Sequence, residues 1–584
     1  MNMKKLIYII LILQVFLVSC EDILSPELEN NRPLQDIYYD AAFAEGLLIN
    51  AYRRVPDNNL SYLEVATDNA VINDKFSSFR NMATGQWSAM YNPVEQWSNA
   101  LTAINYINLF LKHIDSVKWS VLDTVKGRLL KDRNKGEAYG LRALFMYYLL
   151  QAHAGYVGDQ LMGVPILTEF VDAKTLSNLR RNTFDECVNQ IYNDIAEAEK
   201  YLPLEYKNIS KASALPPQYS NVDIGTYNKV FGDINRLRIS SGVLKALKAK
   251  VALLEASPAY GGTQEDWEKA AQYAADVIVN VIGGLSKIDP EGHRYYKGTN
   301  IDNINLTIRR DQREMLWRGS LYNTYDPELN NYPPSLYGNG RINPSQNLVD
   351  AFPMANGYPI NHPSSGYDSS KPYTNRDPRF YEYIIYNGST FAGKVINTKV
   401  NSPTDDGIDK IKTSTRTGYY LKKLLREDIN LDPTSRSAKA RYPVYIRATD
   451  ILLIFAEAAN EAWGPDYKYS NISARDVIAA IRKRAGITQP DNYLNSITTK
   501  EEMRELIRNE RRIELCFEGY RFWDLRRWKV NLEKLNEPIK GIRIYDNSFV
   551  IDVIENRIYK EHMYYGPIPY NEVIKNNLSQ NNGW

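Results

Sequence analysis

Apolar residues recur every three or four positions in several long segments of the chain. In residues 40–54, for example, Phe43, Leu47 and Ala51 would lie on one face of a helix. This spacing is typical of amphipathic α-helices that pack on a core. The pattern predicts helices over residues 40–54, 94–114, 137–154, 184–202, 242–257, 267–282, 449–463 and 473–485.

The eight predicted helices fall into four consecutive pairs. Trp267, Ala270, Ala271 and Ala274 form a face of small residues that is typical of the second helix in a tetratricopeptide hairpin. One hairpin cannot bury its apolar face alone, so stacked hairpins would form a continuous scaffold. The predicted fold class is therefore mostly α, with a tetratricopeptide-like scaffold of four helix hairpins, long loop-rich insertions and minor β structure.

The longest insertion differs in character from the helical segments. Residues 286–425 are rich in Tyr, Asn, Gly and Pro, and they lack long helical periodicity. Such stretches are usually functional or disordered, and the high aromatic content argues against disorder. Strand-like pieces occur at 314–317 and 383–386, and Trp317 is expected in the core. We predict one domain over residues 34–584, with helical scaffold at about 34–285 and 440–530 and a loop lobe at about 286–439.

The first twenty residues predict the cellular compartment. Lys4 and Lys5 precede an apolar run that is too short to span a membrane comfortably. The run ends at Ser19-Cys20, which looks like a bacterial lipoprotein box. We therefore expect a signal peptide over residues 1–19, lipid attachment at Cys20 and a tether over residues 20–33. The protein would be anchored in the outer membrane and face the cell exterior.

Charge and composition exclude several classes of function. The chain has 71 Lys and Arg against 69 Asp and Glu, and the leader contributes two of the lysines, so the rest is formally neutral. Neutrality argues against nucleic acid as a partner. With only 5 His and 3 Cys, a Cys/His metal site is not expected, and no cofactor motif occurs. Cys187 and Cys516 are interpreted as buried free thiols, with a disulfide as the alternative.

Several motifs carry a resemblance to one family. The segment from Glu510 to Trp528, ERRIELCFEGYRFWDLRRW, resembles the C-terminal hallmark of the SusD/RagB outer-membrane lipoproteins almost residue for residue. Asn375-Arg376-Asp377-Pro378-Arg379 matches the family's NRDPR block. Other similar blocks are LRA at 141–143, GVPIL at 163–167, AEAANE at 456–461, IRKRAG at 481–486, PIP at 567–569 and QNNGW at 580–584.

The resemblance implies both a function and a set of partners. Members of the family cap a SusC-like TonB-dependent outer-membrane transporter and bind glycans or their oligosaccharide fragments, while some relatives hold peptides. They are not enzymes, and their hallmark residues are structural. The chain is therefore expected to be a non-enzymatic nutrient-binding lipoprotein with an oligosaccharide ligand.

The hallmark also has an interpretation of its own, apart from the resemblance. Arg508 and Arg512, and likewise Glu510 and Glu514, are like-charge neighbours at i, i+4 on a helix. Such pairs are mildly unfavourable alone, so each charge needs partners on other elements. The segment therefore predicts an ion network between elements. A catalytic pair of carboxylates is the alternative, although so many arginines would keep the acids ionised.

Two loop stretches contain the side chains that sugar binding requires. A sugar ring needs an aromatic face for its C–H groups and polar side chains for its hydroxyl groups. The stretches 68–80 and 322–341 offer both, and they correspond roughly to the regions that line ligand sites in the family. The candidate ligand residues are Asn73, Lys75, Phe76, Phe79, Tyr322, Tyr325, Tyr332, Tyr337 and Arg341.

Two other functions remain open at this stage. A surface glycoside hydrolase needs only two carboxylates, which no motif excludes. A tetratricopeptide-type adaptor would use the Tyr-rich loops to dock another protein. Sequence alone also leaves open which glycan or peptide is bound and whether a structural calcium ion is present.

Overall fold

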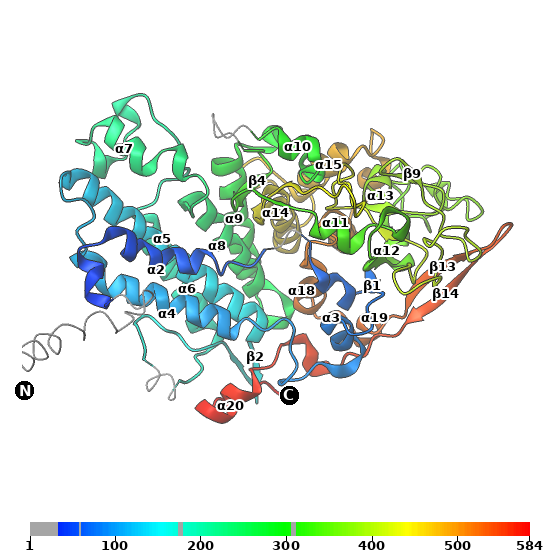
Figure 1. Cartoon of the computed structure of the whole chain (residues 1–584), viewed down its shortest axis with the longest axis horizontal. Helices are drawn as coiled ribbons and strands as arrows, with labels where there is room; N and C mark the ends of the chain where they lie inside the picture. Colours follow the sequence, from blue (N-terminus) through cyan, green and yellow to red (C-terminus); the bar gives the residue numbers. More distant parts are fainter. Residues whose placement is uncertain (1–32, 58–59, 173–178, 305–310) are drawn as a thin grey trace, which may run out of the picture.

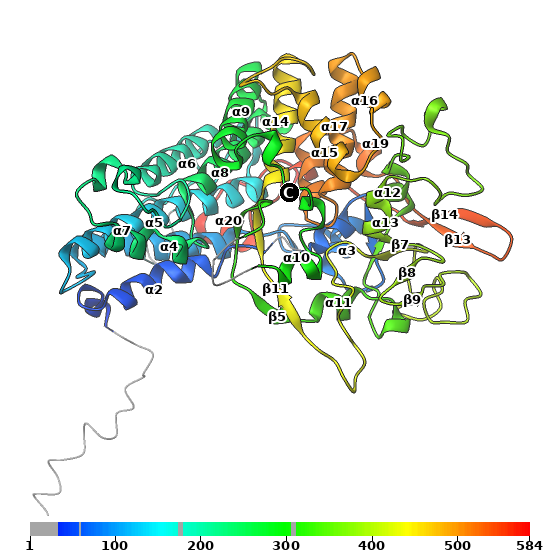
Figure 2. The same cartoon turned by 90° about the horizontal axis from the view of Figure 1, so that it is seen from above.

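The computed structural model describes residues 33–57, 60–172, 179–304 and 311–584. The lipid-attachment residue expected at Cys20 lies outside these residues. Long helices fill one half of the molecule, and short elements joined by loops fill the other (Figures 1 and 2). No helix in the described ranges is both long enough and apolar enough to cross a membrane.

The helical half contains the four predicted pairs, together with two helices, α7 and α17, that lie outside the predicted ranges. Its principal helices are α2 (Ala41–Tyr52), α4 (Trp97–His113), α5 (Thr124–His153), α6 (Phe184–Glu199), α7 (Ile224–Phe231), α8 (Ser241–Ala256), α9 (Gln264–Asp276), α14 (Ala448–Trp463), α15 (Ala474–Ala485) and α17 (Lys500–Glu514). Within the pairs, α2 packs on α4, α5 on α6, α8 on α9 and α14 on α15. Contacts of α4 with α5, α6 with α8 and α9 with α14 join the pairs into one stack. The mostly helical fold class is confirmed.

Helix α5 is much longer than its apolar pattern predicts, since it begins at Thr124 rather than near residue 137. Asp123 caps it by accepting a hydrogen bond from the backbone N–H of Lys126. Its first half carries Arg133 and Glu137, which are buried but paired. Tyr52 and Arg238 also donate to the Glu137 carboxylate. These paired charges are buried on α5 where apolar residues would otherwise continue the helical pattern. Apolar periodicity therefore predicted only the second half of the helix.

The remaining helices are short. They are α3 (Ser78–Asn81), α10 (Gly298–Asp302), α11 (Asp326–Asn331), α12 (Gln346–Ala351), α13 (Pro378–Tyr383), α16 (Asn492–Ser496), α18 (Tyr520–Arg527), α19 (Leu532–Leu535) and α20 (Tyr570–Asn576). Four of them, α10 to α13, lie in the expected loop lobe. In the described part of that lobe no helix exceeds six residues, as its lack of periodicity predicts.

The strands form only two-stranded antiparallel pairs in the part of the chain that the structure describes. The pairs are β1 (Ala70–Ile72) with β6 (Ile342–Pro344), β2 (Gly155–Val157) with β3 (Gln160–Met162), β4 (Met315–Arg318) with β12 (Val444–Arg447), β5 (Tyr322–Thr324) with β11 (Lys439–Arg441), β7 (Ile384–Ile385) with β10 (Tyr420–Leu421), β8 (Thr390–Phe391) with β9 (Lys394–Val395) and β13 (Ile539–Ile544) with β14 (Phe549–Glu555). The two strand-like pieces predicted in the lobe correspond to β4 and β7, and Trp317 is buried as expected.

The loop lobe has a hydrophobic core of its own, and tyrosines are a large part of it. Buried members include Tyr295, Tyr332, Tyr383 and Tyr419. A buried phenol is tolerated when its hydroxyl finds a partner. Tyr383 donates to the carbonyl of His293, and Tyr419 donates to the side chain of Gln346. Part of the tyrosine surplus is therefore structural rather than surface-forming.

A buried ion network joins the lobe to the helical stack. Arg379, from the NRDPR block, contacts Glu510 at 2.9 Å and Glu514 at 3.1 Å, both on α17. Arg482 on α15 contacts the other oxygen of Glu510 at 2.9 Å, and Arg484 contacts Glu514 at 2.7 Å. The network predicted for the hallmark is confirmed, and it also explains why Asp377 and Arg379 of the NRDPR block are buried.

Replacing Glu510 with Gln tests this network. The substitution leaves Arg379 and Arg482 buried beside a neutral group, so we expect it to lower the free energy of unfolding by roughly 3–5 kcal/mol. Urea denaturation of both proteins measures the difference. Glu501→Gln on the same helix is the control, because Glu501 is exposed and its loss should change stability by less than about 0.5 kcal/mol. Equal stability of the two variants would contradict a structural role for the network.

Candidate ligand-binding surface

The pairing of β1 with β6 brings the two predicted ligand stretches together. Ile72 lies opposite Ile342, and the backbone N–H of Asn73 then donates to the carbonyl of Arg341 at 3.2 Å. The Arg341 guanidinium lies 3.4 Å from Asn73 Oδ1 and 3.7 Å from Asp74 Oδ2. Residues more than 260 positions apart therefore form one polar surface, which we call the Asn73–Arg341 surface.

Asn73 serves mainly to hold this surface together. Its side-chain amide donates to the carbonyls of Asn339 and Gly340 at 2.9 and 2.8 Å. It also reaches the carbonyl of Ser414 at 3.3 Å. An amide that is committed to three carbonyls fixes the loops around it, and it has little donor capacity left for a ligand.

Two aromatic rings project from the same segments. Phe76 is 91% exposed, next to the exposed Lys75, and its backbone N–H donates to Asp74 Oδ1. Tyr337 is 51% exposed and has a φ of 64°, a left-handed conformation that is costly for a residue with a side chain. Such strain often marks functional positions. Both rings are open to solvent, and the Lys394 ammonium lies 6.0 Å from the centre of the Tyr337 ring.

The remaining predicted aromatics have other positions. Tyr332 is 1% exposed, and its hydroxyl donates to the carbonyl of Arg426, so it belongs to the core and is removed from the candidate contacts. Phe79 is half-buried and packs against two cores. Tyr322 lies on β5 opposite Arg441, and Tyr325 follows that strand with the Arg436 guanidinium 5.0 Å from its ring centre. These two tyrosines belong to a different strand pair.

Sequence reasoning missed the arginines beside this surface. Arg80 and Arg416 each contact Glu555 Oε2 at 2.7 Å, and Arg557 contacts its other oxygen at 2.6 Å. Burial alone would raise the pKa of Glu555, but Arg557 and Arg416 hold it below its ordinary value. Arg416 also donates to the carbonyl of Ile72 in β1. Arg80 stood at the end of a predicted stretch, whereas no sequence pattern pointed to Arg416.

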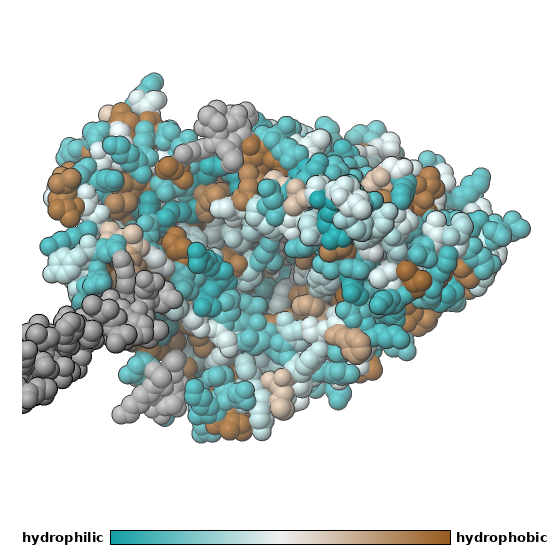
Figure 3. All heavy atoms as spheres, in the orientation of Figure 1, coloured by the Kyte–Doolittle hydropathy of each residue, from teal (hydrophilic) through white to brown (hydrophobic). Residues whose placement is uncertain are grey.

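The exposed face around these elements is mixed in character. Figure 3 shows hydrophobic residues scattered singly among hydrophilic ones over the face that it presents. Isolated apolar residues of this kind are normal on a protein surface. Phe76 has polar neighbours along the chain, namely Asp74, Lys75 and Ser77, as a ligand rich in hydroxyl groups requires.

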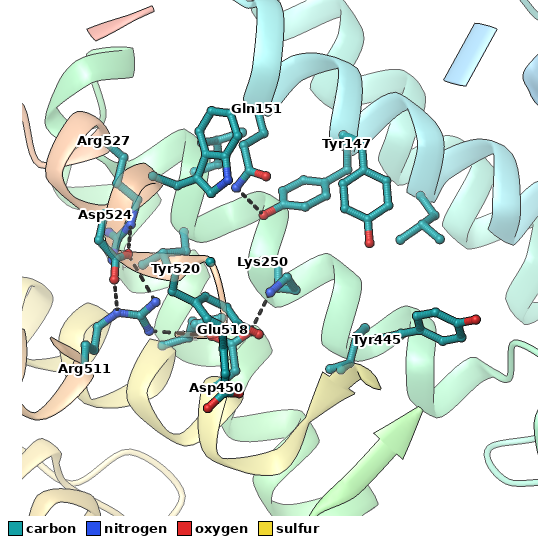
Figure 4. A pocket seen from close by; sticks show the side chains of 18 residues that line it. Tyr147, Gln151, Lys250, Tyr445, Asp450, Arg511, Glu518, Tyr520, Asp524 and Arg527 are labelled. Carbon is teal, nitrogen blue, oxygen red and sulfur yellow. Dashed lines mark hydrogen bonds and ion pairs between the residues drawn. The ribbon is translucent and has the colours of Figure 1, made fainter. Parts of the chain in front are cut away.

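The hallmark lines a small, partly open cavity between α5, α8, α14 and α18 (Figure 4). Its volume is about 80 Å³, well below the roughly 300 Å³ at which small-molecule sites begin. Its charged side chains form ion pairs with one another. Lys250 contacts Asp450 at 2.5 Å, and Arg511 contacts Asp524 at 3.1 Å. This cavity is a structural junction rather than a sugar site.

Two buried acids, Asp524 and Glu64, bear on the alternative of a catalytic carboxylate pair. Burial would raise the pKa of Asp524, but Arg511 and Arg527 hold it below its ordinary value, so it stays ionised. Burial does raise the pKa of Glu64 to about 7, which suits a general acid. Glu64 is fully buried, however, and its carboxylate accepts hydrogen bonds from Asn69 and from the N–H of Gly519, so a substrate cannot reach it.

Metal and thiol chemistry receive no support from the described residues. They contain no group of three or more His, Cys, Asp or Glu that could hold a metal ion. Cys187 and Cys516 are both buried and free, as the sequence suggested. Burial raises the pKa of the Cys187 thiol to about 11 and that of Cys516 to about 12, so neither is reactive at neutral pH.

Comparison with known proteins shows which proteins this chain resembles. The C-terminal part, residues 304–584, matches the model described as SusD family, and residues 35–216 match one described as starch-binding associating with outer membrane. SusD-like protein P38 of Formosa agariphila is 23% identical over 558 residues, which cover 92% of this chain and 93% of that protein.

Solved structures agree with this assignment. A SusD-like protein from Bacteroides fragilis superposes with a TM-score of 0.72 at 23% identity, covering 95% of this chain and 100% of the other. A SusD-like carbohydrate-binding protein from the same species gives a TM-score of 0.67 at 20% identity, covering 92% and 99%. With the hallmark, the NRDPR block and the stacked hairpins in place, and both family models matched in the expected order, the chain belongs to the SusD/RagB family.

Proposed function

We propose that this protein binds oligosaccharides at the outer surface of the outer membrane and passes them to a SusC-like TonB-dependent transporter. It would act without breaking bonds in its ligand. Support comes from the family, since one matched model is described as starch-binding and outer-membrane associated. A similar solved structure is described as carbohydrate-binding.

The observation that carries the proposal is the exposure of two aromatic rings in the two predicted ligand stretches. Phe76 lies beside Asp74 and Lys75, and Tyr337 lies four residues before Arg341 with the Lys394 ammonium 6.0 Å from its ring centre. The C–H face of a sugar ring would cover these rings, while Lys75, Asp74 and Arg341 offer hydrogen bonds to hydroxyl groups. The anchored amide of Asn73 keeps these side chains in register.

Binding without cleavage agrees with the pairing of carboxylates and arginines near this surface. Burial would raise the pKa of Glu555, an acid beside the Asn73–Arg341 surface, but Arg557, Arg416 and Arg80 hold it below its ordinary value. A carboxylate held by guanidinium groups is a poor proton donor. Hydrogen bonds and ring contacts are therefore the interactions that this surface supplies to a ligand.

Lipid attachment at Cys20 would keep the binding protein beside its transporter. A tether over residues 20–33 would leave the folded domain free to move relative to the membrane. Two or more acyl chains suffice for stable anchoring, and no transmembrane helix is then required. An acylated N-terminus and a ligand-binding face on loops together form the arrangement expected of a lid over a transporter.

Phe76→Ala combined with Tyr337→Ala tests the ligand surface. Calorimetry against a panel of neutral and uronate-containing oligosaccharides should show at least one ligand for the wild-type protein. The double variant should bind that ligand at least tenfold more weakly, since each lost ring contact is worth about 1 kcal/mol. Tyr467→Ala is the control, because Tyr467 is equally exposed but lies after α14, and binding should not change. Unchanged affinity in the double variant would contradict this site, and binding to no glycan would favour a protein-binding adaptor.

The Cys20→Ala variant tests the anchor. Without the thiol no acyl chain can be attached, so the protein should move from the membrane fraction to the soluble fraction. Immunoblotting of fractionated cells measures the distribution, and metabolic labelling with a fatty-acid analogue reports acylation directly. Cys187→Ala should remain membrane-bound, because that buried thiol is not the proposed attachment site. Membrane retention of Cys20→Ala would refute lipid attachment at this residue.

A further inference from the structure

A groove lined by positively charged side chains lies between α17 and residues 528–534, which lead into α19. Figure 2 labels both helices. Its volume is about 390 Å³, which is within the range of small-molecule sites. The cationic side chains that line it are Arg508, Arg512, Arg521 and Lys534. Glu505 is the one acid among its lining residues in the described chain. None of these residues belongs to the Asn73–Arg341 surface.

Most of the cations in the groove already have partners. Arg521 makes two hydrogen bonds of 2.9 Å to Asp68, and Arg512 contacts the same carboxylate at 3.1 Å. Lys534 lies 3.3 Å from Asp68 and 2.5 Å from Glu537. Asp68 and Glu537 together therefore serve three cations, which leaves a small local excess of positive charge.

Arg508 is the exception. Its guanidinium lies 4.8 Å from the centre of the Trp528 ring, which is itself buried and fixes its position. Its ion pair is with Glu505, at 3.6 Å, and the Glu505 side chain is 76% exposed. The Arg508 guanidinium donates no hydrogen bond within the described chain. A guanidinium has five N–H donors in a planar fork that matches the oxygens of a carboxylate or sulfate.

The pKa values of two of these arginines also indicate that their charge is only partly compensated. Burial lowers the pKa of the Arg508 guanidinium, because Glu457 and Glu505 compensate it only in part. Burial also lowers the pKa of Arg512, despite Asp68. Arg379 in the network differs, because its acids raise its pKa well above the ordinary value. Burial also lowers the pKa of Arg181, Arg376 and Arg526, so the distinguishing feature of the groove is that its arginines line an open hollow of about 390 Å³.

We propose that this groove is an oxyanion-binding site in which Arg508, held over Trp528, takes a carboxylate or sulfate group with help from Arg512 and Lys534. Charge-assisted hydrogen bonds of this kind are short and strong. The same chemistry is offered by a free inorganic anion and by the acidic group of a charged sugar. The site therefore favours negatively charged ligands, in a protein whose sequence is close to neutral overall.

The test is calorimetric titration at low ionic strength, where electrostatic binding is not screened. Sodium sulfate should give saturable binding to the wild-type protein, and sodium chloride at equal ionic strength should not. Arg508→Gln should weaken sulfate binding at least tenfold, and Lys534→Gln should weaken it severalfold. Arg504→Gln is the matched control, because Arg504 lies one turn away on α17 but pairs with Glu461. Its sulfate affinity should equal that of the wild-type protein.

A second titration identifies the source of the anion. Glucuronate binding more tightly than acetate, with no binding of glucose, would assign the groove to acidic sugars. Acetate and glucuronate of equal affinity would assign it to small free anions, and either result supports an oxyanion site. Equal sulfate affinity of Arg508→Gln and wild type, in variants with unchanged circular dichroism, would overturn the proposal. So would the absence of saturable binding by every anion. Oligosaccharide binding through Phe76 and Tyr337 is measured separately, so the two proposals can fail independently.

Discussion

The structure depends on buried guanidinium–carboxylate pairs that cross from one element to another. Arg379 comes from the loop lobe, Arg482 and Arg484 from α15, and Glu510 and Glu514 from α17. Removing these charges from water is expensive, and only near-complete pairing offsets the cost. The lobe has short helices and short strands, so it cannot rely on regular secondary structure for its position. The ion pairs hold the lobe in one position on the helical stack, because a small displacement of the lobe would break them.

A fixed lobe is what a loop-borne binding surface needs. The Asn73–Arg341 surface consists of turns rather than helices, and its order comes from the β1–β6 pair and from the amide of Asn73. Rigid presentation lowers the conformational entropy that the loops themselves would lose on binding a ligand. Tyrosine serves two purposes in this lobe. Tyr332 fills its core, while Tyr337 projects from its surface.

Charge is balanced over the chain but not in each locality. Asp68 serves three cations in the α17 groove, and Glu555 serves three arginines near β1. A net charge near zero is therefore compatible with distinct positive regions on the folded protein. Because the Debye length is about 8 Å at physiological ionic strength, it is this local balance that a bound ligand experiences.

The sequence by itself determined the helical stack and its pairing. Apolar spacing located the eight helices, and like-charged neighbours such as Glu510 and Glu514 required partners on other elements. The resemblance carried by the segment 510–528 and by NRDPR gave the family. Local patterns suffice here because helix faces and helix ends are written within a few turns of chain.

Tertiary structure alone decided which side chains meet. The sequence could not distinguish the buried Tyr332 from the exposed Tyr337, because neighbouring tyrosines in an irregular segment have no period that assigns a face. It also could not predict the first half of α5, where burial of the Arg133–Glu137 pair breaks the apolar stripe. Arg341 lies beside Asn73, and Arg508 lies over Trp528 with no short acid partner, only because of the fold. Contacts between distant segments depend on the packing of the whole chain, which no local pattern encodes.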